Sequence, residues 1–449
     1  MKTKKFPENF IWGVASSDFQ IEGSSDICSK GESIWDRFCR IPGRIKNGDT
    51  AERACDHHRL FKDDIALMKE LGIKSYRLSL SWTRIFPDGK GRLNEEGLKF
   101  YRELLEELVR NDIKPMVTLN HWSLPQKLQD IGGWTNPDMP EYFKVYSETA
   151  FKAFGDIVPF WITHNEPVEI CYLGYHTGEN APGIRDFSAG LLASKNMLIA
   201  HGLAVKSYRA GGYKGEIGIT LDFHSGIPET DSDDDIKSAE YVHLFFNRWF
   251  QDGVFKGQFP EKLTKHLKSK GVIVPEIEIS ESEIMKERID FLGINAYFPF
   301  YVSYDKPDWP LEASMKSFKK GRDTTGMGWD INPEDFHDTI MSVKNLYGNI
   351  PVFITENGAA FSDVVERDGS INDPGRIDYL CRHFEAAHKC IDEGINLKGY
   401  YVWSLMDNFE WNSGFSQRFG LVHVDYASLK RTIKLSGYWY RDLIMNNSL

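Results

Sequence analysis

The chain has 449 residues, with 54 Lys or Arg against 65 Asp or Glu, so its formal net charge is −11. Hydrophobic residues make up 41% and charged residues 27%, an ordinary globular composition that excludes a disordered or collagen-like chain. The acidic balance offers no basic stripe for nucleic acid, and no run of 18 apolar residues is present that could cross a membrane.

Short apolar, β-rich runs recur along the chain and alternate with amphipathic segments. The predicted strands cover residues 10–15, 75–81, 115–120, 160–163, 216–223, 290–298, 351–356 and 399–405. Amphipathic helices are predicted at 60–71, 95–111, 139–154, 335–347 and 373–393. Several strands are apolar on successive residues, which is typical of parallel strands buried on both faces.

Eight strands that alternate with helices, in a chain that no linker divides, predict the α/β class. We expect a single-domain (β/α)₈ TIM barrel that spans residues 1–449. A doubly wound sheet is the competing fold, but no Gly-x-Gly-x-x-Gly motif follows the first strand. The acidic cluster at Asp231 and 233–235 predicts a loop followed by the start of a helix.

The six cysteines are scattered and form neither a Cys-x-x-Cys pair nor a zinc-like spacing with histidine: Cys28, Cys39, Cys55, Cys171, Cys381 and Cys390. Reduced thiols in a reducing compartment are therefore expected. The basic residues 1–5 are followed by a segment that lacks the apolar core and cleavage site of a signal peptide. These features predict a cytoplasmic protein of unknown oligomeric state.

A metal site is suggested only by the pair His57-His58, which lies near Asp56 and Asp63. Adjacent histidines on a helix point apart, and the sequence has no His-Glu-x-x-His motif. We therefore expect no metal and no other cofactor.

A barrel enzyme should carry its reactive groups at the C-terminal ends of its strands. The predicted strands end in such residues: Arg77, Asn120-His121-Trp122, Asn165-Glu166, Asn295 and Tyr297, Glu356, and Trp403. One acid at a strand end is as often a helix cap or an ion-pair partner as a catalyst. Two acids among His, Asn, Arg and Trp at one barrel mouth favour catalysis.

Glu166 and Glu356 form a pair of carboxylates that a closed barrel brings together. Such a pair suits glycoside hydrolysis, in which one acid protonates the leaving oxygen and the other stabilises or attacks the anomeric carbon. A separation of about 5–5.5 Å between the two carboxyl groups indicates retention, and one of ~6.5–9.5 Å indicates inversion. The sequence leaves both outcomes open at this point.

Six motifs occur in order along the chain and together resemble the family 1 glycoside hydrolases, the β-glucosidase family. They are Phe19-Gln-Ile-Glu-Gly23, Tyr76-Arg-Leu-Ser-Leu-Ser-Trp82, His121-Trp122, Asn165-Glu-Pro167, Ile354-Thr-Glu-Asn-Gly358 and Trp403-Ser-Leu-Met-Asp-Asn-Phe-Glu-Trp411. The resemblance extends over residues 6–440. It implies a single (β/α)₈ barrel and cleavage with retention.

By position, the resemblance makes Glu166 the general acid/base and Glu356 the nucleophile. Arg77 and Tyr297 resemble the residues that hydrogen-bond the nucleophile and keep it ionised. The charge of Glu356 should raise the pKa of Glu166, which then holds its proton near neutral pH. Once Glu356 is glycosylated, that charge is lost, and Glu166 can act as a base towards water.

The resemblance also implies a small carbohydrate substrate and a set of residues that bind it. Asn165 would contact the hydroxyl at carbon 2, and Trp403 would form the floor. The expected substrate-binding residues are Gln20, His121, Trp122, Asn295, Trp329, Trp403, Glu410, Trp411 and Phe419. Glu410 would repel a phosphate, so we expect unphosphorylated sugars and neither nucleic acid nor membrane as a partner.

The resulting prediction is a retaining β-glucosidase that hydrolyses terminal non-reducing β-D-glucosyl residues through a covalent glycosyl-enzyme intermediate. A β-galactosidase, a β-fucosidase or a transglycosylating member of the family is the alternative. A non-catalytic carbohydrate-binding barrel is a hypothesis of a different class, and the presence of both acids argues against it.

Val168 and His164 are among the positions that depart from the usual family pattern. Val168 stands where Trp is usual, which removes a stacking surface for the leaving group, although Trp329 could supply another. His164 occupies a position that is usually apolar, and we interpret it as a core histidine.

Overall fold

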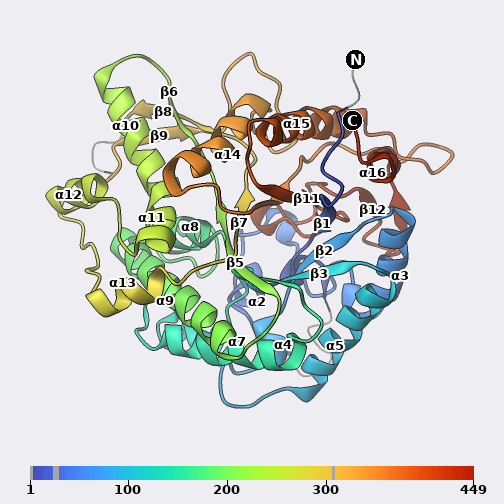
Figure 1. Ribbon diagram of the computed structural model, residues 1–449, viewed down its shortest axis with the longest axis horizontal. Helices are drawn as coiled ribbons and strands as arrows, with labels where there is room; N and C mark the ends of the chain where they lie inside the picture. Colours follow the sequence, from blue (N-terminus) through green and yellow to red (C-terminus); the bar gives the residue numbers. More distant parts are fainter. Residues whose placement is uncertain (1–3, 24–29, 306–308) are drawn as a thin grey trace.

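A closed barrel of parallel strands forms the centre of the computed structural model and is surrounded by helices (Figure 1). The structure describes residues 4–23, 30–305 and 309–449, and in these residues eight strands pair in the order β1-β11-β10-β7-β5-β4-β3-β2. Their bounds are β1 Ile11–Ala15, β2 Ser75–Ser79, β3 Lys114–Asn120, β4 Phe160–Asn165, β5 Glu216–Asp222, β7 Phe291–Asn295, β10 Val352–Asn357 and β11 Leu397–Trp403. The predicted (β/α)₈ barrel is confirmed, and each predicted strand overlaps one barrel strand.

Some strand pairs keep one register throughout, whereas the pairs of β4 with β5 and of β10 with its two neighbours shift register. β1 pairs with β11 without a shift, from Ile11↔Gly399 to Ala15↔Trp403. The register shifts between Ile162 and Asn165 where β4 meets β5, and after Ile354 where β10 meets both β7 and β11. Irregularities of this kind re-aim side chains, and these two lie directly before the ends of the strands that carry Glu166 and Glu356.

The predicted helices are all present as α3 His57–Glu70, α5 Glu95–Arg110, α7 Met139–Phe154, α14 Pro333–Tyr347 and α15 Pro374–Asp392. The acidic cluster starts α10, whose first turn is capped by the Ser232 hydroxyl accepting from the Asp235 N–H at 3.2 Å. Further helices are α1 Asp18–Ile21, α2 Ile34–Cys39, α4 Trp82–Ile85, α6 Gln126–Gln129, α8 Pro167–Glu169, α9 Phe187–Ala210, α10 Asp233–His243, α11 Trp249–Lys256, α12 Glu261–Ser269, α13 Ile279–Met285 and α16 Leu435–Asn446.

Two small sheets lie outside the barrel. One contains β6 Gly226–Pro228, β8 Phe300–Tyr304 and β9 Ala313–Lys316, which lie beside α10 (Figure 1). The other pairs β12 Val422–Val424 with β13 Arg431–Ile433. A short π-helical stretch, Ile170–His176, continues α8.

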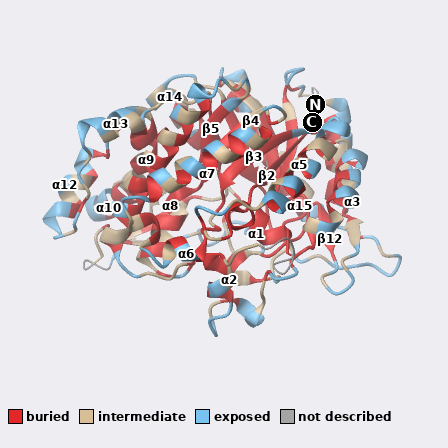
Figure 2. Ribbon diagram, turned by 90° about the horizontal axis from the view of Figure 1, so that it is seen from below, coloured by how far each residue is buried: buried red, intermediate tan, exposed pale blue. Residues whose placement is uncertain are grey.

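The barrel interior is filled by its own cluster of large side chains. Met116, Ile162, Phe291, Phe353 and Tyr401 are fully buried or nearly so and pack against one another. Figure 2 shows the strands and the inner faces of the helices as buried, while exposed residues gather on the outer turns. Because the interior is packed, the barrel is a rigid base that leaves only its C-terminal mouth open to substrate.

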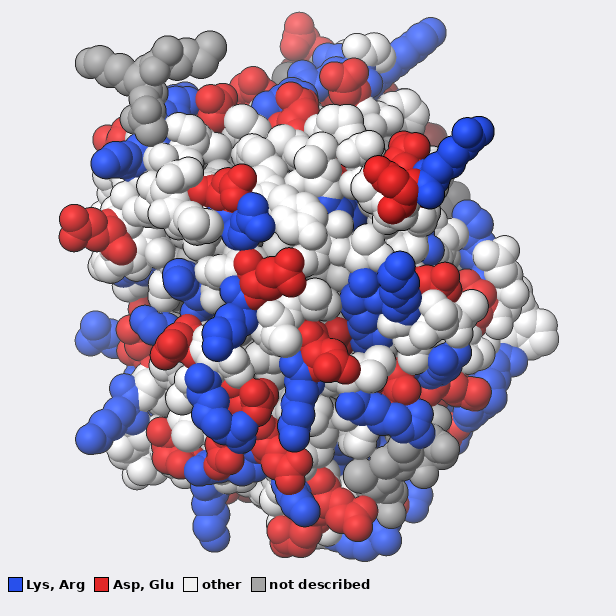
Figure 3. Space-filling view, turned by 90° about the vertical axis from the view of Figure 1, so that its right-hand side faces the viewer, with Lys and Arg blue, Asp and Glu red and all other residues white. Residues whose placement is uncertain are grey.

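The charges on the surface are mixed, and the described thiols are free. The face in Figure 3 intersperses Lys and Arg with Asp and Glu, without a continuous basic stripe on that face. Among the described cysteines, Cys39, Cys55, Cys171, Cys381 and Cys390 are free, while Cys28 lies outside the described residues. No helix in the described part of the chain is both long and apolar enough to cross a bilayer.

Candidate active site

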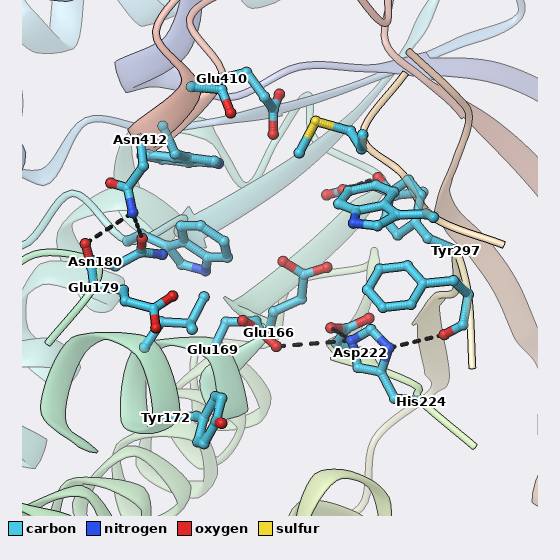
Figure 4. Close-up of a pocket in the computed structure, with 18 of the residues that line it drawn as sticks. Glu166, Glu169, Tyr172, Glu179, Asn180, Asp222, His224, Tyr297, Glu410 and Asn412 are labelled. Carbon is cyan, nitrogen blue, oxygen red and sulfur yellow. Dashed lines mark hydrogen bonds and ion pairs between the residues drawn. The ribbon is translucent and has the colours of Figure 1, made fainter. Parts of the chain in front are cut away.

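A cavity of about 480 Å³ opens among the C-terminal ends of the strands, and both predicted acids line it (Figure 4). Glu410 lies on one side of the cavity, and Glu169, Asp222 and His224 lie on the other. The rest of the lining is mostly aromatic, from Tyr172 to Phe419 along the chain. A flat apolar surface with a few polar tips suits a sugar ring.

Glu356 lies at the end of β10 and is held by two donors. The guanidinium of Arg77, from β2, forms a close ion pair with Oε1, and the Tyr297 hydroxyl donates to Oε2 at 2.7 Å. Burial raises the pKa of Glu356 above its ordinary value, and Arg77 and Tyr297 oppose that rise. The two donors thus favour the ionised form of Glu356.

Glu166 follows β4 and begins α8 with φ +45°, in the left-handed region. Its oxygens accept from two amides: Asn295 Nδ2 donates to Oε1 at 2.7 Å and Asn165 Nδ2 donates to Oε2 at 2.9 Å. Burial raises the pKa of Glu166 well above its ordinary value, and the charges of Asp222 and Glu356 raise it further. Glu166 accepts from two neutral amides, whereas Glu356 is paired with the Arg77 guanidinium, so the two acids differ in the way that an acid/base and a nucleophile require.

A short polar network joins the two acids. Arg77 Nη2 donates to Asn165 Oδ1 at 2.5 Å, and Asn295 Nδ2 donates to the same oxygen at 3.0 Å. The Thr355 hydroxyl donates to Asn295 Oδ1 at 2.8 Å and fixes the orientation of that amide. Residues from β2, β4, β7 and β10 thereby hold both carboxylates through shared partners across the barrel mouth, which limits their independent movement.

Glu410 lies beside Trp403 at the other side of the cavity. Burial and the charge of Glu356 raise the pKa of Glu410 to about 8, whereas Gln20 and Trp403 lower it. Gln20 is fully buried, and its amide donates to Phe409 O at 2.8 Å and towards Glu410 Oε2 at 3.4 Å. The structure therefore places Gln20 behind Glu410, as a donor towards its carboxyl group.

Histidine and tryptophan side chains form the wall between Glu410 and Glu166. His121 stacks with Trp403 and Trp411 at centroid distances of 5.9 and 6.2 Å, and Trp122 lies 4.5 Å from Trp411. Burial and Arg77 lower the pKa of His121 well below its ordinary value, so the neutral ring can accept from Asn165 Nδ2 at 3.2 Å. Trp122 and Trp411 also have positive φ, +73° and +47°. Strained backbone of this kind clusters at functional sites.

The leaving-group side of the cavity contains Trp329 and the residues that follow Val168. Trp329 lines the cavity and stacks with Phe298 at 4.8 Å. Val168 is buried, with 2% of its surface exposed, and the neighbouring Glu169 and Tyr172 line the cavity. The segment that follows Glu166 therefore contributes a carboxyl group, from Glu169, and an aromatic ring, from Tyr172, to the cavity wall.

Sequence reasoning missed Glu169, Asp222 and His224, which meet on this wall. His224 Nε2 lies 2.7 Å from Asp222 Oδ2 and 3.9 Å from Glu169 Oε1. One donor atom from each residue lies within 4.8 Å of the others, a spacing at which they can share a proton or a cation. Asp222 ends β5, which was predicted to cover residues 216–223, so the strand-end criterion could have found it.

The remaining histidines of interest have structural partners. His57 Nδ1 lies 2.8 Å from Asp64 Oδ2, and His58 packs against Phe100 with ring centroids 4.2 Å apart. His164 is fully buried and stacks on Phe143 at 4.4 Å, as predicted for a core residue.

A (β/α)₈ barrel with two buried acids in one aromatic cavity has the architecture of a carbohydrate-cleaving enzyme. The chain belongs to glycosyl hydrolase family 1, because the model of that family matches residues 2–449. Beta-glucosidase A of Acetivibrio thermocellus is 46% identical over 98% of both chains. A solved family 1 β-glucosidase from Thermotoga maritima has a TM-score of 0.96 at 43% identity, covering 100% of both chains. The Thermotoga maritima enzyme in complex with deoxynojirimycin has a TM-score of 0.95 at 44% identity, covering 99% of this chain and 100% of that one.

Proposed function

We propose that this protein is a retaining β-glucosidase that hydrolyses terminal non-reducing β-D-glucosyl residues of oligosaccharides or of aryl and alkyl glucosides. The observation that carries the proposal is the unequal pair of acids, with Glu356 held by Arg77 and Tyr297 and Glu166 beside further negative charge. The similarity to β-glucosidases over nearly the whole chain supports the choice of sugar.

In the first step, Glu356 attacks the anomeric carbon while Glu166 gives its proton to the glycosidic oxygen. A bond from Glu356 to the sugar forms as the bond to the leaving group breaks, so the released alcohol carries the proton of Glu166. In the second step, Glu166 removes a proton from water, the water oxygen attacks the same carbon, and Glu356 leaves as a carboxylate. Two inversions give net retention.

The surrounding residues have roles that follow from their contacts. Arg77 and Tyr297 stabilise the Glu356 carboxylate when it leaves. Asn165 contacts both Arg77 and Glu166, and the hydroxyl at carbon 2 would be bound there. Glu410 accepts from sugar hydroxyls, which makes the site depend on hydroxyl positions. The remaining proposed substrate-binding residues are Gln20, His121, Trp122, Asn295, Trp329, Trp403, Trp411 and Phe419.

The charge of the cavity supports an unphosphorylated substrate. Among the described lining residues, six are carboxylic acids and none is lysine or arginine; the acids are Glu166, Glu169, Glu179, Asp222, Glu356 and Glu410. A phosphate dianion would find no lysine or arginine among these lining residues to bind it, whereas a neutral sugar needs none.

Nitrophenol release from the β-glucoside, β-galactoside, β-fucoside and 6-phospho-β-glucoside, measured side by side without added metal, tests the proposal. We expect turnover of the unphosphorylated sugars, with the β-glucoside among the best. A preference for galactose or fucose would select the alternative within the family. Activity on the phosphorylated sugar alone would contradict the role of Glu410, and no activity at all would favour a binding protein. The anomeric configuration of the first product, followed by NMR, tests retention.

We further propose that the protein is cytoplasmic and that residues 1–449 form one domain. Free thiols at the described cysteines support the first proposal, and the continuous barrel supports the second. Cell fractionation tests the location. A single cooperative unfolding transition, seen alike by two probes, tests the domain assignment.

A further inference from the structure

A cluster of Glu169, Asp222 and His224 lines the substrate cavity, and the proposed mechanism does not use it. The exposed fractions of these side chains are 13%, 5% and 5%. Figure 4 shows them on the side of the cavity away from Glu410. Ionisable side chains are seldom buried to this degree unless they pair with one another or coordinate a metal ion.

The polar atoms of the three side chains converge. His224 Nε2 lies 2.7 Å from Asp222 Oδ2 and 3.9 Å from Glu169 Oε1, and one such atom from each residue lies within 4.8 Å of the others. A tetrahedral zinc ion binds nitrogen and oxygen at about 2.0–2.2 Å, which places its ligand atoms about 3.3–3.5 Å apart. The two separations from Nε2 lie on either side of this spacing, so small rotations of the side chains would fit them around one ion.

Two of these side chains are also held from behind. His224 Nδ1 lies 3.0 Å from the Phe298 carbonyl, which can only accept, so Nδ1 carries a proton and Nε2 is the nitrogen that faces the acids. The Phe223 N–H donates to Asp222 Oδ1 at 3.0 Å, and Oδ2 faces the cluster. A carbonyl behind a histidine ligand and a donor behind a carboxylate ligand are the outer contacts that orient ligands in metal sites.

The position of His224 is fixed by further contacts. Asn247 Oδ1 accepts from the His224 N–H at 3.0 Å, and Asn247 Nδ2 donates to the His224 carbonyl at 2.7 Å. The imidazole stacks on Phe300 with ring centroids 4.4 Å apart and lies 4.7 Å from the Phe298 ring. A ligand held in this way does not have to be ordered when an ion binds.

His337 shows that a histidine between two acids does not by itself make such a site. Its Nδ1 lies 2.8 Å from Asp338 Oδ1, and its Nε2 lies 3.0 Å from Glu393 Oε2. The two acids of His337 therefore lie at different edges of the ring and cannot share one ion with a single nitrogen. Both acids of the cavity cluster face the same nitrogen of His224.

We propose that Glu169, Asp222 and His224 form a binding site for a divalent transition-metal ion such as Zn²⁺, and that the bound ion inhibits the enzyme. One imidazole and two carboxylates are a donor set that suits Zn²⁺, whereas Mg²⁺ prefers oxygen ligands alone. Binding displaces the proton that Nε2 shares with Asp222, and this proton passes to the solvent. Because the three residues line the cavity, the remaining coordination position is open to water.

The inhibition follows from the place of the site and rests on the proposed function. Glu169 and the acid/base Glu166 line the same cavity, and the Glu169 N–H donates to the Glu166 carbonyl at 3.0 Å. The ion and its water therefore occupy space on the leaving-group side, which the substrate needs. The ion is an inhibitor and not a cofactor, since no step of the proposed mechanism uses it.

The test is a titration of Zn²⁺ into the full-length enzyme after dialysis against EDTA, followed by calorimetry. Hydrolysis of nitrophenyl β-glucoside is measured over the same range of Zn²⁺. We expect one Zn²⁺ per chain with micromolar affinity, and inhibition that follows the same saturation curve and is reversed by EDTA. Mg²⁺ should neither bind there nor inhibit. Absence of binding at millimolar Zn²⁺, or binding without inhibition, would overturn the proposal.

Matched variants locate the ion. His224→Phe keeps a ring against Phe298 and Phe300 and removes the ligand nitrogen, while Glu169→Gln keeps the shape and removes a carboxylate. Each should weaken Zn²⁺ binding by about 100-fold or more, because the loss of an outer contact alone costs about 10–100-fold. His337→Asn removes a histidine with two acidic partners outside the cavity and should leave the affinity unchanged.

Unchanged affinity in the folded site variants, or an equal loss in His337→Asn, would contradict the assignment. If His224→Phe does not fold, Glu169→Gln decides the question alone. Calorimetry does not depend on glycosidase activity, so the two proposals fail separately. An active enzyme that does not bind Zn²⁺ would disprove the metal site, and an inactive wild type that binds it would disprove the proposed function.

Discussion

Glu356 and Glu166 occupy the same cavity, yet their immediate partners differ in charge. Glu356 accepts from a guanidinium and a phenol, whereas Glu166 accepts from two neutral amides. Charge-assisted bonds favour the ionised form more strongly than neutral ones. The division between nucleophile and acid/base is therefore built into the side chains that touch each carboxylate.

Replacing Glu356 by alanine removes the nucleophile. We expect Glu356→Ala to lower kcat/KM for nitrophenyl β-glucoside by about 10⁴-fold or more, as for other residues that act as one catalytic unit. The exposed Glu366→Ala on a surface loop should keep normal activity and serves as the control. Near-UV circular dichroism checks that both variants are folded. Ordinary turnover by folded Glu356→Ala would refute the assignment.

Glu166→Ala should affect substrates according to their leaving groups. A poor leaving group such as a sugar alcohol needs the proton of Glu166, so its rate of bond cleavage should fall by about 10²–10⁴-fold. A dinitrophenolate leaves without a proton, and its release in the first turnover should fall far less. Burst kinetics with both substrates measure the difference. Equal losses on the two substrates would show that Glu166 is not the acid.

At the scale of elements, the turn after β10 packs against the end of β11 at a glycine, Gly358. A Cβ built on Gly358, two residues after Glu356, would lie 1.8 Å from the Trp403 carbonyl oxygen. This contact is between two backbones, so a side chain cannot move aside to relieve it. The turn after the nucleophile can therefore pack this closely against the strand that carries Trp403 only because residue 358 has no Cβ.

Gly358→Ala should accordingly destabilise the fold by about 3 kcal/mol, at the upper end of what overpacking costs. Gly375→Ala, in the first turn of α15, meets only the Phe361 ring at 3.2 Å and gains helix propensity, so its effect should be small. Urea unfolding of the two variants makes the comparison. Equal stabilities would mean that the contact is relieved by a shift of the backbone.

The barrel elements were predictable because strands buried on both faces read as short apolar runs. α9 was not predicted because it is buried around most of its circumference: Asn196, Met197 and Leu198 are successive buried residues, and the helix has no single apolar stripe. Hydrophobic periodicity detects a helix that has one solvent-exposed face and one buried face. A helix that is buried on almost every side has no such periodicity.

The catalytic pair was predictable for a related reason: Glu166 and Glu356 break apolar strands with a charge, and the flanking motifs are specific. Asp222 also ends a strand, but it belongs to a cluster with Glu169 and His224 that only the folded chain brings together. The position of Gln20 behind Glu410 likewise depends on contacts between residues nearly 390 positions apart. Spacing along the sequence carries no information on such contacts.

At the scale of the whole molecule, a buried ion network fixes the C-terminal segment to the barrel. The Lys434 ammonium is fully buried between Asp363 and Asp407, with Nζ at 2.6 Å from Asp407 Oδ1. Arg418 Nη1 also donates to Asp407 at 2.6 Å. Two buried carboxylates thus depend on cations from the last 32 residues of the chain.

Lys434→Met leaves these carboxylates with one cation fewer in a dry environment. We expect a loss of about 3–5 kcal/mol in the free energy of unfolding, the usual result of breaking a buried pair. Lys265→Met breaks an exposed pair with Glu261 on α12 and should change stability by less than ~0.5 kcal/mol. Thermal and urea unfolding at pH 7 measure both. A similar small change in the two variants would show that water reaches the buried site.

The pairing of β1 with β11 joins residues 11–15 to residues 399–403. The barrel therefore cannot close until β11 has been translated, after β1 and the six barrel strands that lie between them in the chain. Until then β1 and β10 present open edges that invite pairing with other nascent chains. Closure by β11 makes the finished barrel rigid, but until β11 is made the edges of the open sheet remain exposed to aggregation.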